Sequence, residues 1–178
     1  MTLKLITGPS TEPISLDEVK TELRIDGTEL DASLTRKIKE VRQAVEHELG
    51  RALISQTWEQ VLDSFPTAEV GLGMPPVANV LSVKYLDVTG VEQTVDDTLY
   101  AVDLDSAPGW VLPAYGHCWP QTMCTANAVR VRFLAGYGGA SAVPEAIKGY
   151  MFNLLRADHC GVDVPPYALR LVDRYRTY

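Results

Sequence analysis

The spacing of apolar residues changes twice along the chain, and this change limits the folds that the sequence can form. Up to about residue 49, and again from residue 144, apolar residues recur every three or four positions, as in amphipathic helices. Between about residues 54 and 137 they alternate with polar residues, as in half-buried strands. We therefore predict an α+β fold: an antiparallel bundle of about three main helices, with a small antiparallel β module inserted over residues 54–137 and a C-terminal tail.

The main helices are predicted at residues 15–24, 29–49 and 144–160. The first begins with a capping box, because Ser15 can accept a bond from the backbone N–H of Glu18, whose carboxylate can accept one from Ser15. Thr28 is the predicted N-cap of the second helix, and Gly50 is placed to terminate it. Pro144 suits the first turn of the third helix.

The second helix has a single apolar stripe, formed by Leu30, Leu34, Ile38, Val41, Val45 and Leu49. Arg36 and Glu40 are four residues apart, as are Arg42 and Glu46, and we expect both pairs on the opposite, wet face. His47 is expected at the margin of the stripe, in a structural role. One side of this helix should therefore belong to the core and the other to solvent or a partner.

The last predicted strand shows the alternation most clearly. In "AVRVRFLAGY", Val129, Val131 and Phe133 should face one way, while Arg130 and Arg132 face the other. This pattern is typical of an antiparallel sheet with one solvated face.

Length, charge and cysteine content exclude several classes of protein. The chain has 178 residues, the size of one ordinary domain, and its three cysteines cannot all pair with one another, which favours reduced thiols. It has no apolar run of about 20 residues and no basic start followed by an apolar stretch, so we expect neither a membrane span nor a secretory signal, and folding in a cytoplasm. A net charge of −7 argues against a protein that grips nucleic acid by neutralising phosphates.

The segment "AYGHCWP" raises the possibility of a cysteine nucleophile at Cys118. "GHCW" shares a glycine, a cysteine and an aromatic residue with the papain-type signature, but the earlier cysteine of that signature is absent. Pro120 and a β context follow instead of a helix, and His159 is too close in sequence to be that family's base. The favoured interpretation is a partly buried loop cysteine without a catalytic role.

Metal binding is the second possible role for the cysteines and histidines. The ligand-type residues are His117, Cys118, Cys124, His159 and Cys160. Five residues separate the first two thiols, more than is usual in a structural zinc pair, and the last two residues are adjacent and so point to different sides of a helix. We expect no metal site and no cofactor.

Two further motifs have simple structural interpretations. The loop "AGYGGASAVP" has glycines at positions 136, 138 and 139 but no phosphate-binding lysine, which favours a flexible turn. The carboxylate pairs Asp96 with Asp97 and Asp103 with Asp105 are expected to be solvated turn formers. No constellation of an active site is present, and we predict that the protein is not an enzyme.

The end of the chain has the composition of a docking segment. In "YALRLVDRYRTY", Tyr167, Leu171 and Tyr175 are four residues apart, and the arginines beside them are Arg170, Arg174 and Arg176. Aromatic residues and arginine are enriched where proteins dock on proteins. We expect residues 165–178 to project from a domain of residues 1–164, so that removal of everything after Val164 leaves a folded protein.

The order of these segments resembles that of the head-to-tail connector (adaptor) proteins of tailed phages, in the subgroup with a β insertion. The resemblance runs from about Leu3 to Leu155 and includes "LITGPSTEPISLDEVKTELRID", "ELGRALISQTWEQVLDSFP", "PAYGHCWP", "NAVRVRFLAGYG" and "VPEAIKGYMFNLL". Such proteins also occur in phage-like gene transfer agents. The family often has a small polar residue where Cys118 stands, which argues against a required thiol.

The resemblance implies a structural protein of the virion neck, assembled in a bacterial cytoplasm. It implies a ring, expected to be twelve-fold, beneath the portal protein, with stopper or tail-terminator proteins on the opposite side and double-stranded DNA passing through the lumen. It also implies that the C-terminal segment docks on the portal, and there we expect the contact at Tyr167, Leu171, Arg174, Tyr175 and Arg176, because aromatic and guanidinium groups at a free terminus gain most from burial in a partner. An acidic chain suits such a conduit, because a negative wall repels phosphates.

Two alternatives belong to other classes. A cysteine-dependent hydrolase would need Cys118 for its activity. A small soluble regulatory domain would stay a small species at every concentration, whereas a connector should form rings.

Overall fold

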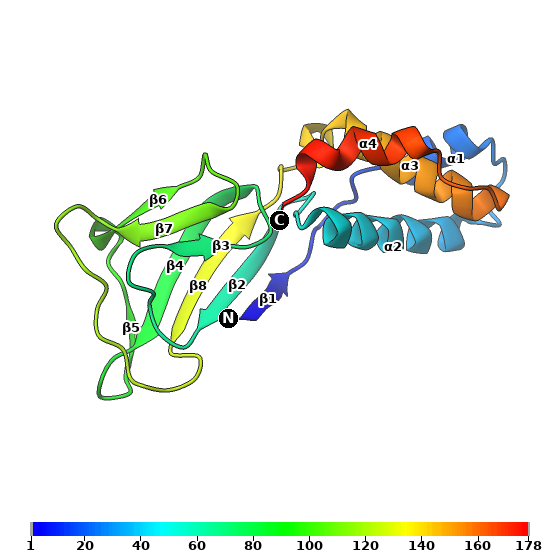
Figure 1. Cartoon of the computed structure of the whole chain (residues 1–178). Helices are drawn as coiled ribbons and strands as arrows, with labels where there is room; N and C mark the ends of the chain where they lie inside the picture. Colours follow the sequence, from blue (N-terminus) through cyan, green and yellow to red (C-terminus); the bar gives the residue numbers. More distant parts are fainter. Residues whose placement is uncertain (1, 178) are drawn as a thin grey trace. The chain divides into compact units, whose positions relative to one another are not determined.

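Two antiparallel sheets and four α-helices make up residues 2–177, the part of the chain that the computed structural model describes (Figure 1). The strands are β1 (Thr2–Thr7), β2 (Gln56–Leu62), β3 (Val70–Leu72), β4 (Val77–Leu86), β5 (Glu92–Thr94), β6 (Tyr100–Asp103), β7 (Gly109–Pro113) and β8 (Val129–Ala135). The helices are α1 (Leu16–Leu23), α2 (Asp31–Leu49), α3 (Glu145–Cys160) and α4 (Pro166–Val172). Single 3-10 turns are η1 (Asp97–Leu99), η2 (Ala140–Ala142) and η3 (Asp173–Tyr175).

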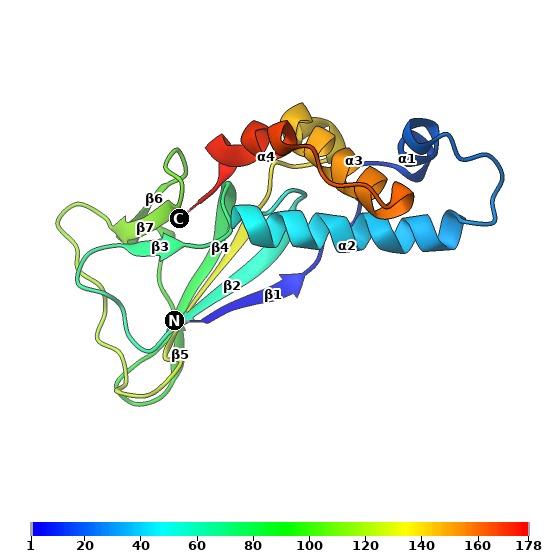
Figure 2. The same cartoon turned by 45° about the vertical axis from the view of Figure 1, so that its right-hand side comes forward.

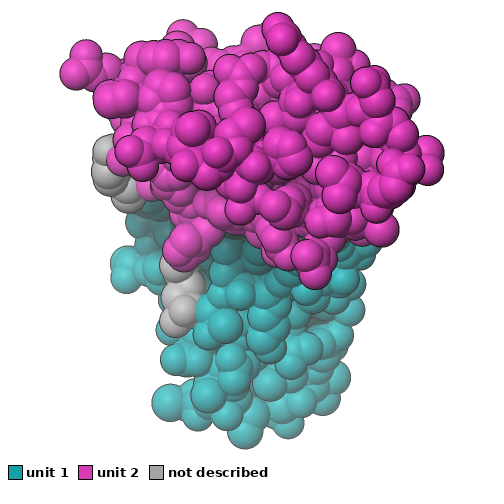
Figure 3. All heavy atoms as spheres, turned by 90° about the vertical axis from the view of Figure 1, so that its right-hand side faces the viewer, with its two compact units in different colours: residues 1–8, 55–136 teal, residues 9–54, 137–178 magenta. Residues whose placement is uncertain are grey.

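The chain forms two compact units (Figure 3). We call the first the β unit; it contains the residues up to Gly8 and Ser55–Gly136. We call the second the helical unit; it contains Pro9–Ile54 and the residues from Tyr137 onward. Each unit has its own buried apolar residues, and each is described separately below.

The β unit is larger than a small inserted module, so the predicted helical bundle with a minor β insertion is wrong. Its five-stranded sheet has the order β1-β2-β8-β4-β5, and its three-stranded sheet the order β3-β7-β6. The first strand comes from the N-terminal segment "TLKLIT", which pairs antiparallel with β2, Leu5 opposite Trp58. The prediction failed here because β1 is a mostly exposed edge strand, joined to the sheet by backbone hydrogen bonds that side-chain patterns do not reveal.

Strand β8 has the alternation that the sequence predicted. Val129, Val131 and Phe133 are fully buried, whereas Arg130 and Arg132 are exposed. The strand lies between β2 and β4 and pairs with both along its length. Its apolar side chains therefore form the centre of the inner face of the five-stranded sheet.

A buried glutamine joins the two sheets. The Gln60 side chain on β2 is 1% exposed, donates from Nε2 to the carbonyl of Gly71 on β3, and accepts from the N–H of Gly73 at 3.1 Å. Gln60 pairs in register with Val131, so the inner face of the five-stranded sheet is the face toward β3. This role is not predictable from the sequence, because a glutamine within a strand gives no sign of which backbone groups it meets.

The helical unit is built around α3, which contacts α1, α2 and α4. Figures 1 and 2 both show α4 running beside α3. The core residues of α2 and α3 include Ile38, Val45, Ile147 and Met151, each at most 3% exposed. Burial of these side chains on facing helices stabilises the unit.

The C-terminal segment joins this core, and the predicted projecting tail is therefore wrong. Ala168 and Val172 of α4 are completely buried in the core of the helical unit. The prediction of a tail depends on little core being left for this segment to join. Small residues four apart on a short helix gave no strong apolar signal, although they fit closely against a neighbouring helix.

The helix ends agree with the prediction at α1 and disagree at the start of α2. The capping box of Ser15 and Glu18 is confirmed, and the backbone bond from Ser15 is the main cause that lowers the pKa of Glu18. Gly50 ends α2 at φ 63°, as predicted. The predicted N-cap Thr28 is wrong: the cap is Leu30, which makes no side-chain bond and is 43% exposed, so it does not belong to the buried stripe.

We predict that Ser15→Ala lowers the free energy of unfolding by about 1 kcal/mol, because it removes the cap of α1. Urea denaturation at neutral pH measures the change. Ser10→Ala is the matched control, since Ser10 is exposed and has no side-chain bond among the described residues. Equal stability of the two variants would contradict a contribution from the cap.

Candidate functional site

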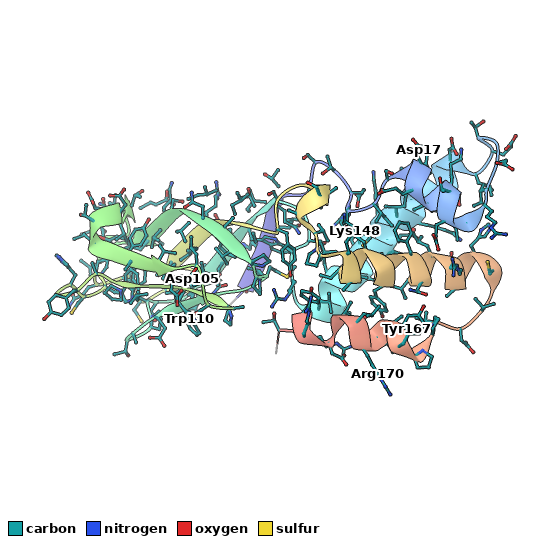
Figure 4. All side chains as sticks on the ribbon, turned by 90° about the horizontal axis from the view of Figure 1, so that it is seen from above. Asp17, Asp105, Trp110, Lys148, Tyr167 and Arg170 are labelled. Carbon is teal, nitrogen blue, oxygen red and sulfur yellow. The ribbon has the colours of Figure 1, made fainter. Side chains whose placement is uncertain are left out.

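Helix α4 presents one covered and one exposed side. Tyr167 and Leu171 lie four residues apart and are 60% and 42% exposed, whereas Ala168 and Val172 are buried. Arg170, between them on the helical surface, is also exposed and points away from α3 in Figure 4. We call Tyr167, Arg170 and Leu171 the α4 face. Large apolar and arginine side chains that lack intramolecular packing are typical of protein docking surfaces.

The residues after α4 are fastened to the C-terminal end of α2. Arg51 donates to the carbonyl of Tyr175, and the N–H of Thr177 donates to the carbonyl of Leu49 at 2.9 Å. The Arg174 guanidinium lies 4.6 Å from the centre of the Tyr175 ring. The terminus therefore satisfies backbone groups at a helix end that would otherwise need water.

Glu48 connects three segments of the helical unit. Its carboxylate accepts from the Tyr150 hydroxyl of α3 at 2.8 Å and from Arg176 at 2.6 Å. Burial, and then the bond to Glu48, raise the pKa of Tyr150 to about 12. These charge-assisted bonds hold the C-terminal segment against α2 and α3, and so fix the orientation of the α4 face.

The structure thus divides the five residues predicted to dock on a partner. Tyr167, Leu171 and Arg174 are exposed. Tyr175 is half-buried against the core of the helical unit, and Arg176 is engaged by Glu48. The first three are available to another protein, while the last two also hold the segment in place.

Helix α2 carries a buried network of charged residues. The prediction that Arg42 and Glu46 lie on the wet face of this helix is wrong. Arg42 and Glu46 are each 6% exposed and form an ion pair at 2.6 Å, and Arg42 also binds Glu12 at 2.8 Å. Glu46 accepts from the backbone N–H of Leu53 at 2.9 Å. Arg42 and Glu46 adjoin Val41 and Val45 of the apolar stripe, and Glu12 and Leu53, from the segments before and after α2, contact them.

We predict that Arg42→Ala lowers the free energy of unfolding by about 3–5 kcal/mol, because it leaves two buried or half-buried carboxylates without their cation. Arg36→Ala is the matched control: its pair with Glu40 is exposed, at 3.5 Å, and should contribute less than about 0.5 kcal/mol. Chemical denaturation of both variants checks the difference, and a similar small loss in both would show that the buried network is dispensable.

The loop that contains Cys118 is held by aromatic packing. Trp119 stacks on Phe65 with ring centres 4.5 Å apart and donates from its indole nitrogen to the carbonyl of Ala68. Cys118 and the neighbouring His117 are exposed, so the prediction of partial burial for this cysteine is wrong. Trp119 is the residue of this loop that packs against the protein, and the neighbouring Cys118 thiol stays exposed to solvent.

The other candidate ligands do not converge. Within residues 2–177 no three His, Cys, Asp or Glu side chains are grouped so as to hold a metal ion. Cys124 and Cys160 are exposed free thiols. The two carboxylate pairs lie in turns, where Asp96 and Asp103 accept from nearby N–H and hydroxyl groups. No helix among the described residues has the length and apolarity needed to cross a bilayer.

Comparison with known proteins finds similarity to a head-tail connector family and to chains of gene transfer agent particles. A model of the phage gp6-like head-tail connector protein family matches residues 13–85. No curated protein sequence matches the chain. The model of the family spans α1, α2 and the first strands after them, and so includes both units.

Solved structures match over the whole length. A chain from the virion of a native gene transfer agent (GTA) particle is 25% identical, with a TM-score of 0.84. A chain from the neck of an empty GTA particle, computed with C6 symmetry, is 24% identical with a TM-score of 0.84, and one from the neck of a native GTA particle, computed with C12 symmetry, is 26% identical with a TM-score of 0.77. Each alignment covers 100% of this chain and 96% of the other.

Proposed function

We propose that this chain, a phage-type head-tail connector protein and thus a structural subunit of the head-tail junction, joins the portal protein to the stopper or tail-terminator proteins as a ring of about twelve copies. The observation that carries this proposal is the similarity of the whole chain to chains of GTA particles, one of them from a neck.

The ring follows from the symmetry of the related assemblies. The similar neck structures were computed with six-fold and twelve-fold rotational symmetry, which describes subunits arranged around one axis. A ring needs two different surfaces on each subunit, because each copy contacts the next head to tail. We infer twelve copies for this chain from the twelve-fold neck.

The portal is proposed to bind the C-terminal segment through Tyr167, Leu171 and Arg174. The exposed positions of these side chains on and after α4 support this assignment. Tyr175 and Arg176 contribute by holding the segment on α2, since Arg51 and Glu48 bind them there. The segment is therefore a preformed docking surface, which loses less conformational entropy on binding than a free tail would.

The function needs no chemistry at a small-molecule site. We propose that the protein is not an enzyme and takes no cofactor, in keeping with the exposed, isolated thiol of Cys118. Its net charge of −7 suits a neck through which DNA passes without being held, because an acidic protein surface repels the DNA phosphates.

We predict that particles made without this chain have filled heads that are not joined to tails, since the junction lacks a subunit. Complementation with the wild-type chain or with Cys118→Ser should restore tailed particles equally, as counted by electron microscopy. Tailed particles in its absence would refute the connector function. A requirement for the Cys118 thiol would instead favour the cysteine-dependent alternative.

We predict that the double variant Tyr167→Ala, Leu171→Ala binds its portal at least tenfold more weakly, because hot-spot side chains each contribute more than about 1 kcal/mol. Thermal unfolding should be nearly unchanged, since both side chains are exposed. Deletion after Val164 is a poorer test, because it removes buried Ala168 and Val172.

The matched control for portal binding is Tyr115→Ala, which removes a fully exposed tyrosine from the β unit. It should bind the portal like the wild type. Portal binding that survives the double variant on α4 would show that another surface makes the contact.

A further inference from the structure

Charge is unevenly distributed over the β unit. Its residues include four Lys or Arg and nine Asp or Glu. The four cations are Lys4, Lys84, Arg130 and Arg132, and all four lie on the same side of the five-stranded sheet. An acidic unit that collects its cations on one side has a surface suited to an anionic partner.

The strand register places these cations together. Lys4 pairs with Glu59, which pairs with Arg132 on β8, and Arg130 pairs with Lys84 on β4. These residues alternate with Val129, Val131 and Phe133, so they occupy the outer face of the sheet. We call Lys4, Lys84, Arg130 and Arg132 the basic face.

Only part of this positive charge is neutralised within the chain. Arg132 pairs with Glu59 at 2.8 Å, and Lys84 pairs with Glu92 at 2.9 Å. Among residues 2–177, Lys4 and Arg130 form no ion pair, and both are exposed. The outer face therefore keeps a positive excess.

The outer face of the three-stranded sheet has apolar side chains at its centre and, among the described residues, no Lys or Arg. Ala101 pairs with Leu112 and Asp103 with Trp110, and these four residues alternate with the fully buried Val111. Leu112 is 37% exposed, and Trp110 lies across Gly71 of β3. This face, which includes Trp110 (labelled in Figure 4), is thus apolar at its centre.

Carboxylates lie at both ends of β6, the strand that pairs with β7. Asp96 and Asp97 precede β6, Asp103 is its last residue and Asp105 follows it; Asp105 is also labelled in Figure 4. Hydrogen bonds from Thr98 and Ser106 lower the pKa values of Asp96 and Asp103, so these groups stay ionised. We call Trp110 and Leu112 with these four carboxylates the acidic face. An apolar centre with a charged rim is the usual anatomy of a protein interface.

The two faces lie on opposite sides of the β unit. The inner faces of the two sheets meet through Gln60, which binds Gly71 and Gly73, and Val77 of β4 lies against Gly109 of β7. Complementary surfaces on opposite sides of a subunit produce head-to-tail contacts, which close as a ring of several copies and not as a two-fold dimer.

We propose that, in the ring, the basic face of one copy binds the acidic face of the next copy. This inference rests on the proposed connector function, and it identifies the contact between neighbouring subunits. Half-buried Trp110 and exposed Leu112 would be covered at its centre, while Arg130 and Lys4 meet the carboxylates at its rim. Such charge complementarity sets the order and orientation of the copies.

A DNA duplex is the weaker candidate for the basic face. Two of its four cations are already paired with carboxylates, whereas proteins that hold DNA through its backbone make roughly 6–10 phosphate contacts. A second copy of the chain requires only a few charge pairs, because the apolar centre supplies most of the contact.

Charge reversal tests the proposal in assembling particles. Arg130→Glu with Arg132→Glu, and separately Asp97→Lys with Asp105→Lys, should each lower the number of tailed particles at least tenfold, because like charges then face each other. A mixture of the two variants should restore assembly to within about twofold of the wild type, since alternating copies make every junction complementary again. Circular dichroism melts verify that each variant is folded.

The controls separate this proposal from the connector function itself. Arg130→Lys with Arg132→Lys should assemble like the wild type, because it keeps the charge. Normal assembly of either charge-reversal pair, or failure of the mixture to restore it when both variants are folded, would overturn the interface while leaving the connector function intact. Loss of binding to a 30-base-pair duplex without loss of rings would assign the basic face to DNA and also overturn the proposal.

Discussion

The pairing of β8 with β2 and β4 determines which side of the five-stranded sheet each residue faces, and the surfaces of the β unit depend on it. Because strand side chains alternate, a slip of one residue would bury Arg130 and Arg132 and expose Phe133. The cost of burying two guanidinium groups without partners makes such a slip very unfavourable. The bonds of Gln60 to β3 then orient the second sheet over the apolar side, which leaves charged residues on the outside.

The helical unit presents a surface by a different route. Its C-terminal segment contributes Ala168 and Val172 to the core and is held by Glu48 and Arg51 on α2. The same packing turns Tyr167 and Leu171 outward. The packing that buries one side of α4 therefore also exposes the other side, so the same contacts form the core and orient the proposed docking surface.

These features describe a protein whose specialised parts are surfaces. The carboxylates that attract attention in the sequence serve in turns, the cysteines are exposed and isolated, and the buried ionic network of Arg42, Glu12 and Glu46 braces the helical unit. A structural subunit of the head-tail junction, the function proposed above, depends on surfaces of this kind because it binds other subunits. The chain is similar over its full length to chains of GTA particles.

The sequence by itself determined the local structure: the capping box at Ser15, the end of α2 at Gly50, the alternation in β8 and the order of segments that resembles the connector family. These features depend on neighbours a few residues apart, whose geometry the backbone sets directly. Only the tertiary structure decided that β1 completes the sheet, that Arg42 and Glu46 are buried, that Ala168 and Val172 belong to the core, and that all cations of the β unit share one face. Each of these depends on contacts between residues far apart in the chain, which form according to backbone pairing and available space and leave no periodic pattern in the sequence.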